Sequence, residues 1–235
     1  MSPATGPAPG PAPGLAAVRG ALAPHGLDVT GGFHPGPEDG VPGAAAAGTL
    51  LMVGATGGGL WAAFSAAPEH GDGAPDPLDR WSRRVLSAVA EALGAEALFP
   101  FGGPPWLPFM RWAARAEGAT ASPVAMAVTP ARGLYASWRG ALGLRTRLDL
   151  PALPPPGPPP CATCAAPCTR ACPVDAFADG TYDVARCRAH LDRPEGAPCR
   201  EAGCLARRAC PANVALPAAQ AAFHLEAFRR AGRPA

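Results

Sequence analysis

The sequence predicts an α+β protein in two parts: an N-terminal domain over residues 15–150 and a smaller domain over residues 161–235. Three observations lead to this prediction. Apolar runs of the strand type alternate with amphipathic helical segments in the first part. All eight cysteines lie in the second part. The Pro-rich run 151–160 separates the two parts and is expected to be a stiff linker on the surface.

The chain begins with segments of low complexity. Residues 1–14 are a Pro/Ala/Gly tract, for which we expect disorder or a fragment of polyproline II helix. Residues 15–24 carry apolar side chains at helical spacing and predict a short amphipathic helix. Residues 31–48 are rich in Gly and Pro and predict a loop.

The centre of the first part contains its strongest secondary-structure signals. The continuous apolar run 49–54 predicts a buried strand, and a helix is expected at 60–67. Residues 76–93 form the clearest helix, with one apolar stripe and charged residues largely outside it. A strand is predicted at 97–101 and a short helix at 109–117.

Two further predictions complete the secondary structure. Residues 123–129 and 134–144 are read as a β-hairpin around a turn at 130–133. Residues 215–228 are predicted to form a C-terminal helix. A Gly-rich loop at 55–59 follows the strand at 49–54, but its glycine spacing is not that of a dinucleotide-binding turn. We therefore favour a plain tight turn over a phosphate site.

Composition excludes several classes of function. The formal net charge is +2, which argues against charge-driven binding to nucleic acid or to a membrane surface. All 20 basic residues are Arg, so a P-loop lysine and a Schiff-base lysine are both excluded. No apolar run reaches the roughly 18 residues of a membrane span. We see no signal peptide and expect a cytoplasmic, bacterial protein.

The cysteines carry the strongest chemical signal. The first four are spaced C-x2-C-x3-C-x3-C and a proline follows; the last cysteine also precedes proline. The eight are Cys161, Cys164, Cys168, Cys172, Cys187, Cys199, Cys204 and Cys210. Eight thiolates are the number that two [4Fe–4S] clusters need at four ligands each.

Two other interpretations of the cysteines stay open. A disulfide framework is allowed by the even count, although small secreted scaffolds do not usually carry a large cysteine-free region beside them. A zinc ribbon could use Cys161 and Cys164, but no later pair has C-x2-C spacing and four cysteines would be left over.

The segments 171–177 (ACPVDAF) and 182–187 (YDVARC) resemble a bacterial two-cluster ferredoxin. The resemblance covers about 50 residues. It implies that one cluster is held by Cys161, Cys164, Cys168 and Cys210, and the other by Cys172, Cys187, Cys199 and Cys204. The chain departs from the ferredoxin pattern in an extra residue before Cys168 and in a stretched second motif.

The run 122–142 (SPVAMAVTPARGLYASWRGAL) resembles the cobalamin-processing CblC proteins, with Pro130, Gly133, Arg139 and Gly140 in register. Tyr135 stands at a family Trp position. Thr129 and Ala131 replace the family His and an Arg that helps hold a thiol cosubstrate, so electrons from clusters could replace the thiol.

A CblC-like domain followed by two clusters is also the plan of epoxyqueuosine reductases and reductive dehalogenases. This second resemblance implies a nitroreductase/CblC-like α/β sandwich followed by a small ferredoxin-like dicluster domain. It also implies a cobalamin, for which we take Trp106, Tyr135, Trp138 and Arg139 as candidate contacts. The aromatic, Pro-rich loop 102–112 is either a packed corner or a wall for a large planar ligand.

Three hypotheses of function follow. The first is an iron–sulfur redox protein that passes electrons through two [4Fe–4S] clusters to a cobalamin in the N-terminal domain. The second is a plain ferredoxin-type carrier with a partner reductase, in which the N-terminal domain is a docking module. The third is a flavin- or nucleotide-dependent reductase. No general acid or base can be named from the sequence, because no carboxylates are paired in a suitable spacing.

Overall fold

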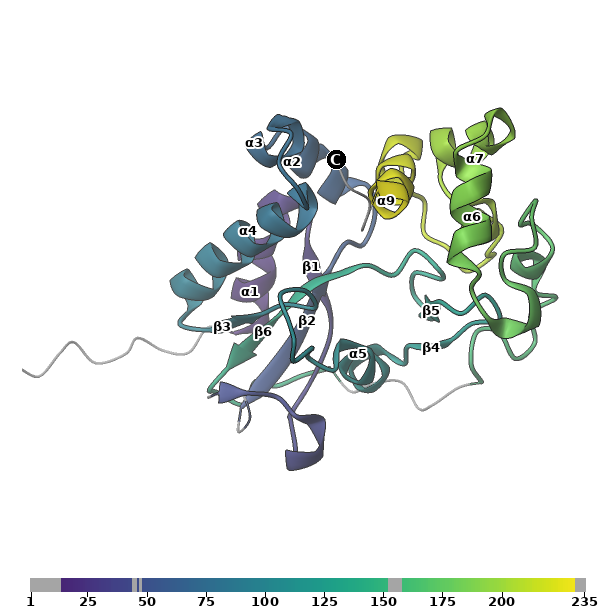
Figure 1. Ribbon diagram of the computed structural model, residues 1–235. Coiled ribbons are helices and arrows are strands. Elements are labelled where there is room, and N and C mark those ends of the chain that lie inside the picture. The colour runs from purple at the N-terminus through teal and green to yellow at the C-terminus, as the bar shows by residue number, and fades with distance from the viewer. Residues whose placement is uncertain (1–13, 44–45, 47, 152–157, 231–235) are drawn as a thin grey trace, which may run out of the picture.

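The computed structural model describes residues 14–43, 46, 48–151 and 158–230 of the 235-residue chain. Nearly all of the N-terminal tract and most of the expected linker therefore lie outside the described residues. The described part is an α+β structure, as the sequence predicts, with two small antiparallel sheets (Figure 1).

A four-stranded antiparallel sheet organises the first part of the chain, in the order β1-β2-β6-β3. Its strands are β1 (Asp28–Phe33), β2 (Thr49–Gly54), β6 (Trp138–Leu144) and β3 (Glu96–Leu98). Every residue of β2 is buried, because helices cover both faces of the sheet. The predicted strand at 49–54 is confirmed to the residue.

Side chains alternate along β2 between two hydrophobic cores. Leu51 and Val53 join the first core, in which the sheet packs against three helices. These are α1 (Leu15–Leu22), α2 (Gly59–Ser65) and α4 (Pro77–Leu93). Leu50 and Met52 face the second core, which α5 (Phe109–Glu117) covers. The sheet thus lies between two helical layers (Figure 1).

The shorter and later elements complete the chain. Helix α3 spans Pro68–Gly71, and a two-stranded sheet pairs β4 (Thr120–Ala121) with β5 (Ala127–Val128). The cysteine-rich part contains α6 (Val184–Leu191), α7 (Ala197–Ala202), α8 (Leu205–Arg208) and α9 (Ala218–Arg230). Within the part of the chain that the structure describes, no helix is both long and apolar enough to cross a membrane.

The predicted hairpin of 123–129 with 134–144 is wrong. Strand β5 pairs with β4, whereas β6 enters the centre of the large sheet between β2 and β3. In the described residues a single isolated bridge links Thr129, the end of the first predicted arm, to Gly133 at the end of the predicted turn. Strand β6 is nearly all apolar and buries residues on both faces, so pairing within the larger sheet covers it better than a local hairpin would.

Strand β1 falls partly in the segment for which the sequence predicts a loop. Its sequence, DVTGGF, has a low strand propensity because of its two glycines. Gly31 is required by packing, since a Cβ atom there would lie 2.4 Å from the carbonyl oxygen of Ala116 on α5. The glycines lower the strand propensity of this segment, so the sequence predicts a loop, but the small size of Gly31 lets α5 pack closely against β1.

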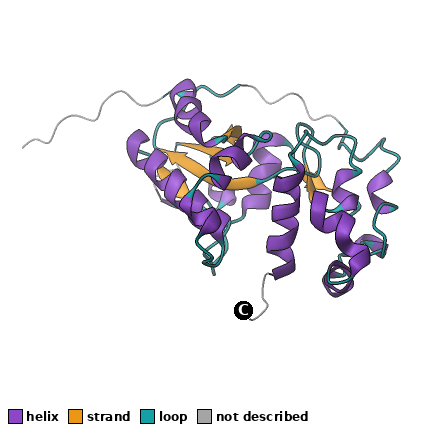
Figure 2. Cartoon of the chain, turned by 90° about the horizontal axis from the view of Figure 1, so that it is seen from above, coloured by secondary structure: helices purple, strands orange, loops and turns teal. Residues whose placement is uncertain are grey.

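The cysteine-rich part packs directly against residues of the first part. Val124, Val128 and Leu134 form one hydrophobic cluster with Cys168, Phe177 and Ala206. Helix α9 lies between the α2–α3 region and α6–α7 in Figure 1, and in Figure 2 the helix that leads to the C-terminus stands between the large sheet and the helices on its other side. The segment around β4 and β5 therefore packs directly against the cysteine-rich part.

Candidate metal centres

The eight cysteines are all free thiols, and they line two separate cavities. The first cavity, of about 370 Å³ including the part open to solvent, is lined by Cys161, Cys164, Cys168 and Cys210. The second, of about 310 Å³ on the same basis, is lined by Cys172, Cys187, Cys199 and Cys204. These are the two sets of four that the ferredoxin resemblance implies. We call them the outer set and the inner set, because the inner set lies in sequence between Cys168 and Cys210 of the outer set.

Short turns bring the outer set together. Cys161 and Cys164 lie in a turn, and Cys168 lies in the 3-10 helix Pro167–Thr169. Cys210 comes from the far side of the inner set, just after α8. The rest of the wall includes Ser122, Pro123, Val128 and Leu134 from the first part of the chain. The outer cavity therefore lies at the junction of the two parts.

Helices hold the inner set. Cys187 lies on α6, Cys199 on α7, and Cys204 is the N-cap residue of α8. Cys172 comes from the loop that precedes α6. Leu225 of α9 also lines this cavity. The stretched spacing of the second motif is therefore occupied by α6 and α7, which place their cysteines around one space.

Burial and mutual repulsion raise the pKa of four of the cysteine thiols, two in each set. Burial raises the pKa of Cys161 and Cys168, and the neighbouring thiolates of the same set raise it further. Burial likewise raises the pKa of Cys187 and Cys204 in the inner set. Four thiolates in one such cavity require a positive centre among them, which a metal ion or an iron–sulfur core supplies.

Backbone amides already donate to several of these sulfurs. The N–H of Ala166 donates to Cys164 Sγ at 3.4 Å, and that of Ala176 donates to Cys172 Sγ at 3.3 Å. Hydrogen bonds from Arg207 and Ala206 N–H groups to Cys204 partly offset the effect of burial on its pKa. Such donors stabilise sulfur in its anionic, metal-bound form.

The sulfurs of each set line a space and do not converge on one point. Among the described residues, no group of three or more Cys, His, Asp or Glu side chains is close enough to hold a single metal ion. A structural zinc site has four donors at about 2.0–2.3 Å from one ion. The cysteines here surround a larger volume.

Tyr182 is a site residue that the sequence analysis did not single out. Its hydroxyl hydrogen-bonds with the Cys187 thiol, and burial raises the pKa of Tyr182 well above its ordinary value. The ring stacks on Phe177, at 4.7 Å between centroids, and on Phe228 of α9, at 5.7 Å. Its position five residues before a cysteine was visible in the sequence, but its partner Phe228 could not be foreseen.

Arg207 was also missed. Its guanidinium group donates to the carbonyl oxygen of Leu134 at 2.8 and 3.1 Å and lies 5.3 Å from the centre of the Tyr135 ring. Burial lowers the pKa of Arg207, while Cys204 and Tyr135 act in the opposite direction. This half-buried positive charge lies between Cys204 of the inner set and Leu134 and Tyr135 of the first part of the chain.

The four candidate cobalamin contacts do not line one cavity. Trp106 is 65% exposed and borders a cavity with Arg83, Phe99 and Phe101. Arg139 is half-buried beside this cavity, where it forms an ion pair with Asp79 and lies 5.8 Å from the Phe101 ring.

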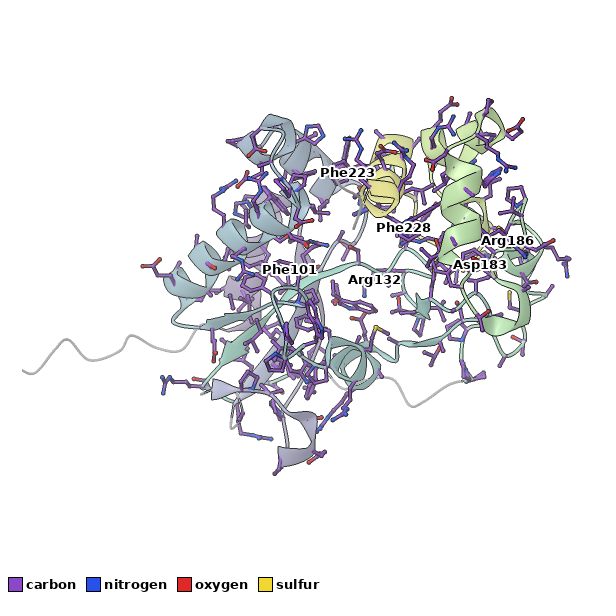
Figure 3. All side chains as sticks on the ribbon, in the orientation of Figure 1. Phe101, Arg132, Asp183, Arg186, Phe223 and Phe228 are labelled. Carbon is purple, nitrogen blue, oxygen red and sulfur yellow. The ribbon has the colours of Figure 1, made fainter. Side chains whose placement is uncertain are left out.

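The other two candidates have structural partners of their own. Tyr135 packs against Arg207. Trp138 Nε1 donates to Glu117 at 2.5 Å, and Glu117 also pairs with the buried Arg132, whose guanidinium lies 5.6 Å from the Trp138 ring. Figure 3 labels Arg132 below α9 and Phe101 on the side of the sheet nearer α4. In the described structure Trp138 therefore belongs to a buried polar network.

Comparison with protein-family models, with curated proteins and with solved structures found no match for this chain.

Proposed function

We propose that this protein is an iron–sulfur electron-transfer protein that binds two [4Fe–4S] clusters. The observation that carries the proposal is the sorting of eight free cysteines into two sets of four around two separate cavities. Four thiolates per cluster is the ligand number that such clusters require.

The donor set fits the clusters chemically. Thiolates are soft ligands that suit iron–sulfur clusters, and the cavity walls are mainly apolar, which excludes water from them. The N–H donors of Ala166 and Ala176 point at ligand sulfurs. When bound, each cluster supplies transfer of single electrons at a potential between roughly −700 and +450 mV.

The position of the outer set bears on where electrons go. Its cavity wall includes Ser122, Val128 and Leu134 from the first part of the chain, whereas the wall of the inner cavity includes no residue of that part. We propose that this junction is one end of the electron path and that a redox partner protein exchanges electrons with the inner set. An acceptor in the N-terminal part, such as the cobalamin that the CblC resemblance implies, belongs to the same proposal.

The decisive experiment is anaerobic purification followed by iron, sulfide and zinc quantitation and EPR of the reduced protein. We expect about eight iron and eight sulfide per chain. Two single variants, each of which removes a ligand of one set, test whether the two clusters are separate. Cys168→Ala removes a buried outer ligand and Cys199→Ala a buried inner one, and each should leave about four iron per chain. Thr163→Ala, at an exposed position between two outer cysteines, is the matched control and should keep the full iron content.

Three results would contradict the proposal. Zinc in place of iron would make the cysteines structural. Disulfides in the protein purified without oxygen would exclude cluster ligation. Loss of all iron in both variants would mean that the two sets are not separate sites.

The acceptor is tested separately with the loaded protein. Hydroxocobalamin is added to the reduced protein, and the visible spectrum is followed for conversion to Co(II) and Co(I) forms. Reduction at a rate that the Arg139→Gln variant slows would support a corrinoid acceptor in the N-terminal part. An unchanged corrinoid spectrum would leave a plain electron carrier that needs a separate partner reductase.

A further inference from the structure

His190 is the one polar, non-cysteine side chain of the inner cavity. It lies on α6 three residues after Cys187, so both side chains emerge from the same face of the helix. Its Nε2 atom is buried and has no hydrogen-bond partner in the part of the chain that the structure describes. A buried ring nitrogen without a partner is unfavourable, because it has lost water and gained nothing in exchange.

The surroundings of His190 restrict what its partner can be. Apart from the four cysteines, every other side chain that lines the cavity is apolar. The side-chain acceptors that the cavity can offer this nitrogen are therefore the cysteine sulfurs, and a bound cluster would add its own sulfurs. Buried polar groups in native structures are nearly always paired.

We infer that His190 is a positioning residue that donates an Nε2–H hydrogen bond to a sulfur of the cluster held by the inner set. The inference rests on the proposed function. A hydrogen bond to cluster sulfur stabilises the reduced, more negative state and so raises the reduction potential. No proton is transferred: the cluster gains one electron on reduction, and the hydrogen bond becomes stronger.

The outer cavity provides an internal comparison. Its lining includes no histidine, and Ser122 is its single hydroxyl side chain. The hydroxyl of Ser122 accepts the N–H of Met126 at 3.4 Å, and Ser122 lies in the outer cavity, away from His190. Substitution of His190 should therefore change the potential of one cluster and leave the other unchanged.

The first measurement uses wild-type holoprotein labelled with ¹⁵N-histidine, in which both clusters are confirmed by iron content. Pulsed EPR should detect a weak ¹⁵N coupling to one reduced cluster, together with a proton coupling that disappears in D2O. The outer cluster, isolated in the Cys199→Ala variant, should show no such coupling. A strong coupling would mean that the ring nitrogen is an iron ligand and would overturn the inference.

The second measurement is a potentiometric titration of variants. In His190→Phe an aromatic ring is kept but the N–H is lost, and the potential of the inner cluster should become more negative. His190→Gln restores a donor and should recover part of the shift. His34→Gln, in neither cysteine cavity, should leave both potentials unchanged.

The two proposals fail in different ways. Absence of iron contradicts the proposed function itself. Full iron content with no ¹⁵N coupling, or with equal potentials in wild type and His190→Phe, contradicts the role of His190 alone. If His190→Phe does not retain its inner cluster, the ¹⁵N coupling in the wild type and the potential of His190→Gln decide the question.

Discussion

The Oδ1 atom of Asn213 accepts a hydrogen bond from the backbone N–H of Leu134 at 2.8 Å. The Nδ2 atom of the same side chain donates to the carbonyl oxygen of Arg207 at 2.5 Å. Gly133 makes this possible, since a Cβ atom there would lie 2.6 Å from the Asn213 backbone nitrogen. One amide thus fastens the turn after Cys210 to the first part of the chain, beside the outer cavity.

Replacement of Asn213 should loosen this junction. In Asn213→Ala both backbone groups lose a partner, and we expect the free energy of unfolding to fall by roughly 1–3 kcal/mol. Urea denaturation of the metal-free protein measures the loss. Asn213→Asp keeps the acceptor for Leu134 but sets a carboxylate oxygen against the carbonyl oxygen of Arg207, so this variant should lose stability as well. Equal stability of the Ala variant and wild type would show that the amide does not hold the junction.

Gly203 lets α9 approach the inner set. Its φ is +84°, and a Cβ atom there would lie 2.7 Å from the Cβ of Ala221 on α9. Gly203→Ala should therefore push the helix away, cost about 1–3 kcal/mol and lower the iron content of the inner site. Gly180→Ala is the matched control, because Gly180 also has a positive φ, +69°, but open space around it. Equal iron loss in both variants would point to backbone strain as the sole cause.

Two phenylalanines of α9, Phe223 and Phe228, pack against different parts of the molecule (Figure 3). Phe223 packs against Trp61 and Phe64 of α2, at 5.6 and 5.1 Å between ring centroids. Phe228 stacks on Tyr182 in the cysteine-rich part. Since both rings are only partly buried, each change to Ala should cost about 3 kcal/mol or less.

The two variants should nevertheless differ in their site of action. Hydrogen exchange should increase around α2 and α3 in Phe223→Ala and around Tyr182 and α6 in Phe228→Ala. The same exchange pattern in both variants would contradict the view that α9 is held from two sides.

His224 should make stability fall at mildly acidic pH. Burial, with the charges of Arg207 and Arg139, lowers the pKa of His224 from 6.5 to about 4. The unfolded chain therefore binds a proton between these pH values that the folded chain does not. Above pH 6.5 His224 is neutral in both states and costs no stability. As the pH falls from 6.5 toward 4, protonation of His224 in the unfolded chain lowers the free energy of unfolding, by roughly 3 kcal/mol at most.

The test is the difference between wild type and His224→Gln in melting temperature across pH 4–7. Carboxylates titrate in both proteins, so their effect cancels in the difference. The variant should show a shallower decline on the acid side. Parallel curves would mean that His224 is protonated in the folded protein.

The local elements could be read from the sequence, and the non-local ones could not. The strand 49–54 and the helix 109–117 are predicted to the residue, because one is a bounded apolar run and the other has a clear helical period. The hairpin prediction failed because β6 has the same local pattern whichever strand it joins. Its partners are decided by the two helical layers, which lie far away in sequence.

The same division holds for the candidate site. The cysteines are identified by residue type and spacing alone. His190 and Tyr182 are recognisable only once α6 and α9 have been placed around the inner cavity. Trp106 was selected as an aromatic residue in a rigid loop, but 65% of its surface is exposed and nothing in the sequence reports that exposure.

All four inner cysteines lie in sequence between Cys168 and Cys210 of the outer set. The assembly of the outer site should therefore depend on the inner site more than the reverse. While the inner segment is unfolded, the chain between Cys168 and Cys210 is a long flexible loop. Closing this loop to bring Cys210 next to the other outer cysteines costs conformational entropy. Once α6, α7 and α8 have folded around the inner site, this loop is ordered and Cys210 is held close to the other outer cysteines. Maturation should therefore proceed from the inside outward. Iron should leave the outer site faster when the inner site is empty than the reverse.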